Sequence, residues 1–78
     1  MLSEPTRLRM LDLLAKQPDP MCVSDITMRL EQHQPTVSYH LRMLREAGLI
    51  DNEKRGAHSF FWATDQGRSC LSALQTFR

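Results

Sequence analysis

The chain has 78 residues, which fits a single domain, 1–78, with one small core. Hydrophobic residues make up 41% and charged residues 24%, a composition typical of globular proteins that excludes a disordered or membrane-embedded chain. Because the net charge is only +1, overall basicity does not indicate a nucleic-acid partner, and any such indication has to come from where the charges lie. No segment has the pattern of a signal peptide, so we expect a cytoplasmic protein without a membrane partner.

The first part of the chain predicts one helix and a short extended segment. Ser3 is suited to cap a helix that has Pro5 in its first turn and runs to about Gln17. Apolar residues occupy much of the circumference of this helix, so we expect it to be covered on two sides. Pro18–Pro20 ends the helix, because proline cannot continue it. Met21–Val23 then predicts a short extended segment.

Two helices separated by a short break follow, which is the arrangement of a helix-turn-helix. Ser24 is predicted to cap a second helix over Asp25–Glu31, and Gln32–Gln34 form the break. The third helix is predicted over Pro35–Ala47, with Gly48 as its left-handed C-terminal stop.

The third helix has a buried seam and a polar face. The residues expected to support the helix from within are Val37, Leu41 and Leu44 and, near the edge of the seam, His40. Tyr39 and Arg42 lie at the centre of the opposite face. An aromatic hydroxyl and a guanidinium on an exposed helix suit hydrogen bonding to base edges and phosphates. A merely solvated helix face is the alternative.

Two strands are predicted after the third helix, over Leu49–Glu53 and Ser59–Ala63, with Lys54–His58 as the loop between them. A hairpin directly after a helix-turn-helix is a wing, so the predicted fold class is mainly α with a small β-hairpin, a winged helix-turn-helix. Lys54 and Arg55 make the tip of the wing basic. We expect them to contact the DNA backbone or minor groove, although a solubilising turn has the same composition.

Thr64 or Asp65 is predicted to cap a final helix with an apolar face. So small a domain has little room to bury this face together with the apolar circumference of the first helix, which predicts a homodimer. The candidate dimer-interface residues are Met10, Leu14, Leu71, Leu74 and Phe77.

Metal, disulfide and catalytic chemistry are not indicated. Cys22 and Cys70 lie far apart without the spacing of a zinc module, and we expect both to be small buried apolar groups. An alternative hypothesis is a redox switch in which oxidation of one thiol, or a disulfide between the two, changes DNA affinity. The chain has no nucleophile–base motif or glycine-rich phosphate loop, so we predict no catalytic residue, no metal and no cofactor.

The segment QPTVSYHLRMLREAGLI, Gln34–Ile50, resembles the recognition-helix signature of the arsenic-repressor (ArsR/SmtB) family of bacterial winged-helix transcriptional regulators. Leu2–Leu14 is similar to the first core helix of that family, and the GLI, basic-loop and FFWAT segments match its wing. The resemblance implies a bacterial regulator, usually a repressor. Cys22–Asp25 reads CVSD where arsenic-sensing members have CVCD, and no histidine follows His58, where zinc-sensing members have ligands. Metal sensing is therefore not implied.

Together these features predict a sequence-specific transcriptional regulator of double-stranded DNA that acts as a homodimeric repressor. Its third helix enters the major groove and its wing meets the backbone or minor groove. The alternative is a winged-helix module that binds protein within a larger assembly, which the near-neutral charge also fits. An effector, whether a small molecule or a redox signal, is not specified. The predicted DNA-contacting residues are Gln34, Thr36, Ser38, Tyr39, Arg42, Lys54 and Arg55.

Overall fold

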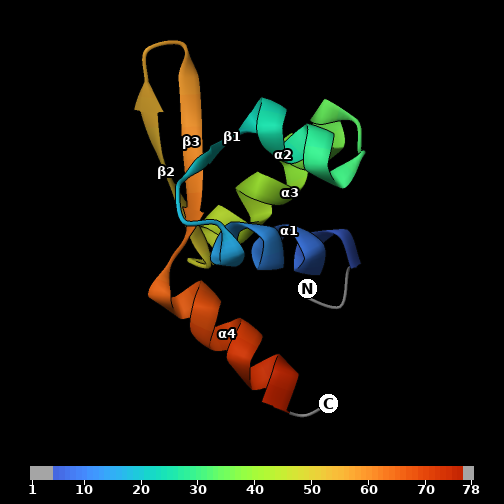
Figure 1. Ribbon diagram of the computed structural model, residues 1–78, viewed down its shortest axis with the longest axis vertical. Coiled ribbons are helices and arrows are strands. Elements are labelled where there is room, and N and C mark those ends of the chain that lie inside the picture. Colours follow the sequence, from blue (N-terminus) through green and yellow to red (C-terminus); the bar gives the residue numbers. More distant parts are fainter. Residues whose placement is uncertain (1–4, 77–78) are drawn as a thin grey trace.

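The computed structural model describes residues 5–76, and the side chains among them as far as Ala73. Within this range the chain forms four helices and a three-stranded antiparallel sheet, the winged helix-turn-helix predicted from the sequence (Figure 1). The helices are α1 (Pro5–Lys16), α2 (Val23–Leu30), α3 (Gln34–Glu46) and α4 (Asp65–Thr76). The strands are β1 (Met21–Cys22), β2 (Ile50–Arg55) and β3 (His58–Ala63). The predicted cap of the first helix, Ser3, lies outside the described residues.

Helix α3 matches its prediction to within one residue at each end. It begins at Gln34, so Pro35 occupies the second helical position, where its missing N–H also has no partner to lose. It ends before Gly48, whose φ of +80° is the left-handed conformation expected at a helix C-terminus.

The start of α2 differs from its prediction. The helix begins at Val23, and Cys22 stands at the capping position, where its side chain accepts no hydrogen bond from a backbone N–H of the first turn. Ser24, the predicted cap, lies inside the first turn and is exposed. The reason is tertiary, because β1 pairs with β3 as far as Cys22, opposite Phe60, and holds the chain extended up to the residue before the helix. The prediction that Ser24 caps this helix is therefore wrong.

The wing is longer, and its turn shorter, than predicted. Strands β2 and β3 pair continuously from Ile50–Ala63 to Arg55–His58, so only Gly56 and Ala57 remain in the turn. Gly56 has a φ of +63° at the first turn position, the glycine arrangement that lets a two-residue turn follow the twist of its strands. Strand β1 adds to β3 on the other side, giving the order β1-β3-β2. In Figure 1 the hairpin projects beyond the helices.

Of the two residues proposed as the cap of α4, the structure selects Thr64. Its hydroxyl donates to the carbonyl oxygen of Gly48 at 2.7 Å and accepts from the backbone N–H of Gly67 at 3.0 Å. The second of these bonds is that of a helix N-cap. The first ties the start of α4 to the end of α3, so one side chain fixes how the last helix leaves the wing.

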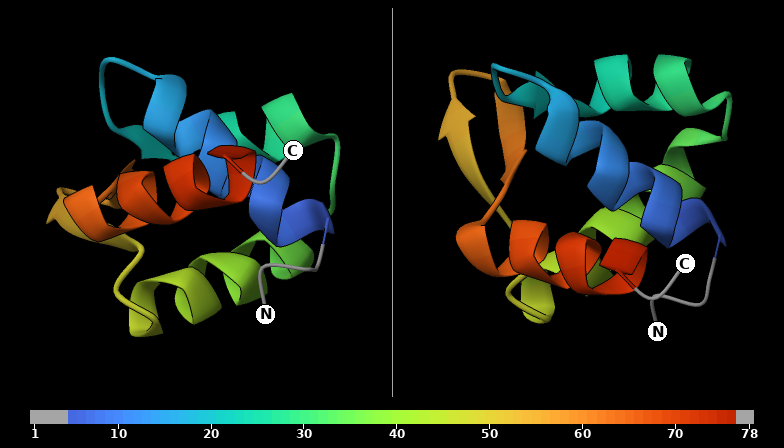
Figure 2. Two further views of the ribbon diagram at one scale, coloured as in Figure 1. Left: turned by 90° about the horizontal axis from the view of Figure 1, so that it is seen from below. Right: turned by 60° about the horizontal axis from the view of Figure 1, so that its bottom comes forward.

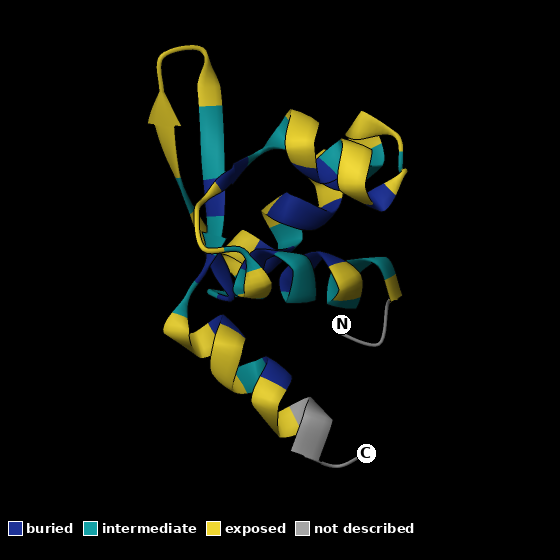
Figure 3. Cartoon of the chain, viewed as in Figure 1, coloured by how far each residue is buried: buried dark blue, intermediate teal, exposed yellow. Residues whose placement is uncertain are grey.

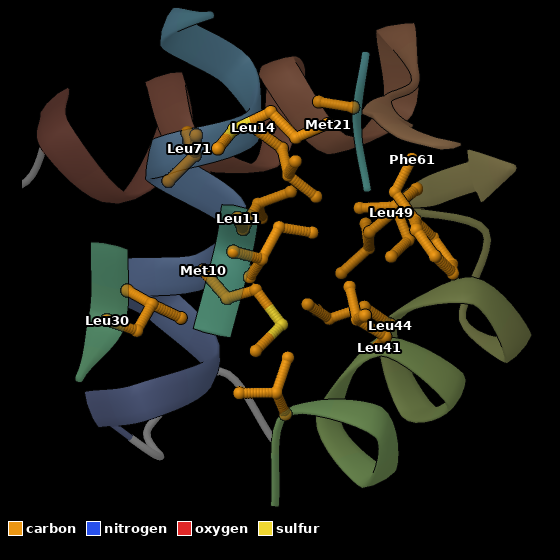
Figure 4. Close-up of a cluster of buried hydrophobic side chains, with 14 residues drawn as sticks. Met10, Leu11, Leu14, Met21, Leu30, Leu41, Leu44, Leu49, Phe61 and Leu71 are labelled. Atoms are coloured by element: carbon orange, nitrogen blue, oxygen red, sulfur yellow. The ribbon is translucent and has the colours of Figure 1, made fainter. Parts of the chain in front are cut away.

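The core lies where α1 meets α3, the sheet and α4 (Figure 4). It accounts for the broad apolar surface of α1, since α3 and the sheet cover one side of that helix and α4 covers another. In both views of Figure 2, α4 runs beside α1. The buried hydrophobic residues are Met10, Leu11, Leu14, Met21, Ile26, Leu30, Val37, Leu41, Leu44, Leu49, Ile50, Phe61, Ala63 and Leu71.

This core overturns part of the predicted dimer interface. Met10, Leu14 and Leu71 were expected on a surface, but their exposed fractions are 0%, 2% and 7% within a single chain. Because the three side chains are already buried in the core of one chain, they expose almost no surface to a partner. The side chain of Leu74, and the whole of Phe77, lie outside what the structure describes.

Candidate nucleic-acid interface

The exposed side of α3 forms a continuous polar surface. At about 100° per residue, Ser38 and Arg42 lie near the middle of the exposed arc, with Tyr39 at one edge and Arg45 at the other. The centre of the exposed surface therefore lies closer to the wing than the predicted centre, which was Tyr39 and Arg42. On the opposite side the helix is anchored in the core by the residues predicted for that role, Val37, His40, Leu41 and Leu44.

The first turn of α3 contributes the other predicted contacts. Gln34 is exposed, whereas Thr36 is half-buried and offers less of its surface. His33 stands at the capping position without a side-chain hydrogen bond, and the amide of Val37 already donates to its carbonyl oxygen at 3.0 Å. The earlier amides of the turn point out of the helix end, where they favour a negatively charged group.

His40 is packed as expected but has a partner that the sequence did not suggest. Its Nδ1 accepts a hydrogen bond from Nε of Arg7 on α1 at 3.1 Å, and only 8% of the residue is exposed. The Arg7 guanidinium also lies 5.7 Å from the centre of the Tyr39 ring, and the rings of Tyr39 and His40 meet edge to face at 5.3 Å. Arg7 therefore connects α1 to the edge of the polar surface. Arg7 and His40 are 33 residues apart, so no local pattern could have found the pair.

Replacing Arg7 by alanine should lower both stability and DNA affinity. The buried Nδ1 of His40 would lose its donor, which costs about 1–3 kcal/mol, and Tyr39 would lose the cation above its ring. A thermal melt should show a Tm lower by several degrees, since about 1 kcal/mol shifts a domain of this size by roughly 4–8 °C. The exposed Arg9 on the same helix gives a matched Arg9→Ala control. Equal melting temperatures for the two variants would contradict this role for Arg7.

The register of the wing decides which way its cations point. Directly paired residues of antiparallel strands lie on the same face of the sheet, and the faces alternate along each strand. Lys54 pairs with Ser59 and Asn52 pairs with Phe61, and Phe61 is buried toward the helices. Lys54 thus shares the sheet face that looks toward α3, and Nη1 of Arg45 donates to Oδ1 of Asn52 from α3 at 3.1 Å.

Arg55 lies on the opposite face of the sheet. Its Nε and Nη2 both donate to Oε1 of Glu53, at 3.1 and 3.0 Å, and its guanidinium lies 5.3 Å from the centre of the Phe60 ring. The exposed wing tip is visible in Figure 3. The two cations that the sequence placed in one basic loop are thus separated, with Lys54 on the side of α3 and Arg55 paired with an acid on the other side.

The part of the chain that the structure describes offers little other chemistry. No group of three or more histidine, cysteine or acidic side chains within it is placed to hold a metal ion. Cys22 and Cys70 are half-buried free thiols, and Sγ of Cys22 donates to Oδ2 of Asp25 at 3.3 Å. None of the described helices combines the length and the apolar character needed to cross a membrane.

The comparisons with known proteins identify transcriptional regulators as the relatives of this chain. The family model described as bacterial regulatory protein, arsR family, matches residues 4–52. A helix-turn-helix-type transcriptional regulator of Methanocaldococcus jannaschii is 42% identical over 62 residues, covering 80% of this chain and 68% of that protein. The arsenical resistance operon repressor of Escherichia coli K12 is 42% identical over 55 residues, covering 70% of this chain but only 46% of the repressor.

Solved structures show the same fold. The S. aureus MepR–DNA complex is similar with a TM-score of 0.83 and 26% identity, over 92% of this chain and 61% of that one. The sequence match covers more than half of this chain and includes all of α1, α2 and α3. The chain belongs to the arsR family of bacterial regulatory proteins.

Proposed function

We propose that this chain regulates transcription by binding a specific sequence in duplex DNA, with α3 in the major groove and the wing against the neighbouring backbone or minor groove. The observation that carries the proposal is the sidedness of α3. Its exposed arc presents Ser38 and Arg42, its other side is locked into the core, and Lys54 projects from the sheet face that looks toward it. Repression is the proposed outcome, as the name of the E. coli relative suggests.

Within this proposal different residues of α3 contact different parts of the DNA. Arg42 and Ser38 lie where a helix in the major groove meets base edges, and an arginine there can donate two parallel hydrogen bonds to guanine. Tyr39 contacts the DNA at the edge of the surface, held by Arg7. Gln34 and Thr36 lie at the end of the helix that enters the groove first in this class of motif.

We further propose that the chain acts as a homodimer on two half-sites related by two-fold symmetry, about one helical turn apart. Among the described side chains of α1 and α4, the partly buried apolar groups available for such a contact are Leu8, Leu13, Ala15 and Cys70. Sedimentation equilibrium should give a mass about twice that of the chain. A single-chain mass, both free and on DNA, would contradict the dimer.

The two cations of the wing should differ in their effect on binding. Lys54→Ala is expected to weaken DNA binding and to reduce the slope of log K against log salt by about 1, as the loss of one phosphate contact does. Arg55→Ala should leave that slope nearly unchanged, because Glu53 already neutralises the guanidinium on the other face of the sheet. Fluorescence anisotropy between about 50 and 200 mM salt measures both slopes. Equal loss from the two variants would contradict the assignment of the faces.

A direct titration separates this function from that of a protein-interaction module. A regulator of this kind binds a labelled duplex of about 30 base pairs with an affinity that falls linearly as log salt rises, in proportion to the phosphates contacted. A chain whose polar helix faces no nucleic acid shows no such dependence. The absence of salt-dependent binding to any duplex would favour the interaction module.

A further inference from the structure

A hollow lies between the recognition helix and the wing, on the side of α3 that faces β3. Its volume is about 230 Å³. The start of α2, the middle of α3 and the centre of the sheet all contribute to its wall. The lining residues are Val23, Ser38, Leu41, Arg42, Arg45 and Phe61.

The geometry of B-DNA indicates what occupies this space. The major and minor grooves are separated by a sugar–phosphate strand. A protein that inserts a helix into the major groove and a wing toward the adjacent minor groove must therefore straddle one such strand. In this chain the space between the two elements is the hollow, since α3 and β3 form its sides.

The chemistry of the hollow suits a sugar–phosphate strand. Val23, Leu41 and Phe61 give it an apolar floor, which suits the carbon atoms of deoxyribose. Two of the residues that line it, Arg42 and Arg45, carry a guanidinium group, and none of them is acidic. Guanidinium groups are the preferred partners of phosphate oxygens in proteins.

Arg45 is the better placed of the two arginines for a phosphate. It lies in the last turn of α3 and donates through Nη1 to Oδ1 of Asn52 on β2, at 3.1 Å. Asn52 is a neutral partner, so it orients the guanidinium without cancelling its charge. The contrast is Arg55, whose partner Glu53 is an acid at 3.0 Å.

We propose that this hollow is a backbone-binding site in which one sugar–phosphate strand of duplex DNA lies, with Arg45 binding a phosphate and Asn52 acting as the positioning residue of Arg45. The proposal rests on the proposed DNA-binding function and adds a residue that sequence patterns did not indicate. Arg45 then contributes affinity that does not depend on base sequence, whereas Arg42 contributes sequence preference.

The test is a double-mutant cycle of DNA affinity. It combines the Arg45→Ala substitution in the protein with single uncharged methylphosphonates that replace one phosphate at a time along the duplex. Arg45→Ala should weaken binding about ten-fold on every duplex sequence and lower the salt slope by about 1. One methylphosphonate position should weaken the unsubstituted protein by a similar factor but cost the Arg45→Ala variant almost nothing. Asn52→Ala keeps the charge, so it should retain the salt slope, lose about three-fold in affinity and show a reduced effect at the same phosphate.

Arg29→Ala is the matched control, because Arg29 is an exposed arginine in the last turn of α2 beside residues 17–20. Unchanged melting temperatures establish that the variants are folded. If every methylphosphonate costs Arg45→Ala as much as it costs the unsubstituted protein, the backbone site is wrong while the DNA-binding function stands. If the unsubstituted protein binds no duplex at all, both proposals fail.

Discussion

Gly67→Ala is expected to destabilise the chain by about 3 kcal/mol, a large fraction of what a domain of this size possesses. A Cβ at this position would lie 2.0 Å from the carbonyl oxygen of Leu49 and 3.1 Å from Cδ1 of Leu11. The first of these is a backbone atom between α3 and β2, so it cannot swing aside as a side chain can. Helix α4 must therefore move away from the core.

That movement would break contacts which depend on the present position of α4. The backbone N–H of Gly67 donates to the Thr64 hydroxyl at 3.0 Å, and Leu71 is buried against α1 one turn later. Loss of an N-cap costs about 1 kcal/mol, and partial exposure of a leucine costs a similar amount. Differential scanning calorimetry should show a Tm lower by more than 10 °C, given roughly 4–8 °C for each kcal/mol.

The matched control for this substitution is Gly56→Ala in the turn of the wing. No atom lies within 4 Å of the new Cβ there, so only the left-handed backbone, with φ +63°, opposes it, at about 1–2 kcal/mol. Gly67→Ala should therefore be clearly the less stable of the two variants. An equal or smaller effect at Gly67 would mean that α4 does not pack against the Leu49 carbonyl.

Arg42→Ala is expected to weaken binding to the preferred DNA sequence by about ten- to a hundred-fold, the cost of losing a two-point contact with a base. Arg42 is exposed and near the centre of the arc on α3, so its replacement leaves the core and the melting temperature unchanged. Arg42→Lys keeps the charge but not the paired donors, and should retain binding to unrelated sequences while losing preference.

These measurements are best made as competition assays between a preferred and a scrambled duplex, with Arg9→Ala as the control for loss of one positive charge on α1. A uniform loss on both duplexes would assign Arg42 to the phosphate backbone instead of the bases. No loss on either duplex would mean that α3 is not the recognition helix.

The sequence alone predicted the ends of a helix correctly where a residue with a restricted or unusual backbone conformation stands there. Pro35 and Gly48 bracket α3, and the apolar spacing between them predicts which side is buried. The prediction failed at Ser24. Ser24 is a good capping residue, but pairing of β1 with β3, segments far apart in the chain, places the start of α2 at Val23, ahead of Ser24. Helix propensity is a weak influence beside a tertiary contact of that kind.

The candidate site shows the same division. The polar arc of α3 could be derived from helical spacing, but its tethers could not, because Arg7 meets His40 only when α1 packs across α3. The sequence also presents Lys54 and Arg55 as one basic loop. They lie on opposite faces of the sheet because the pairing of β2 with β3 continues to Arg55–His58. The sequence predicted a loop over these residues, and a loop has no alternating faces.

Selection of bound sequences from random duplex DNA tests the proposed function most directly, because one experiment examines binding, sequence preference and symmetry together. We expect an enriched motif made of two inverted half-sites whose centres lie about one helical turn apart. The Arg42→Ala protein carried through the same selection should lose the preference at one position of each half-site. A pool that remains random after repeated rounds, with protein shown to be folded, would contradict the assignment of α3 and the wing to DNA recognition.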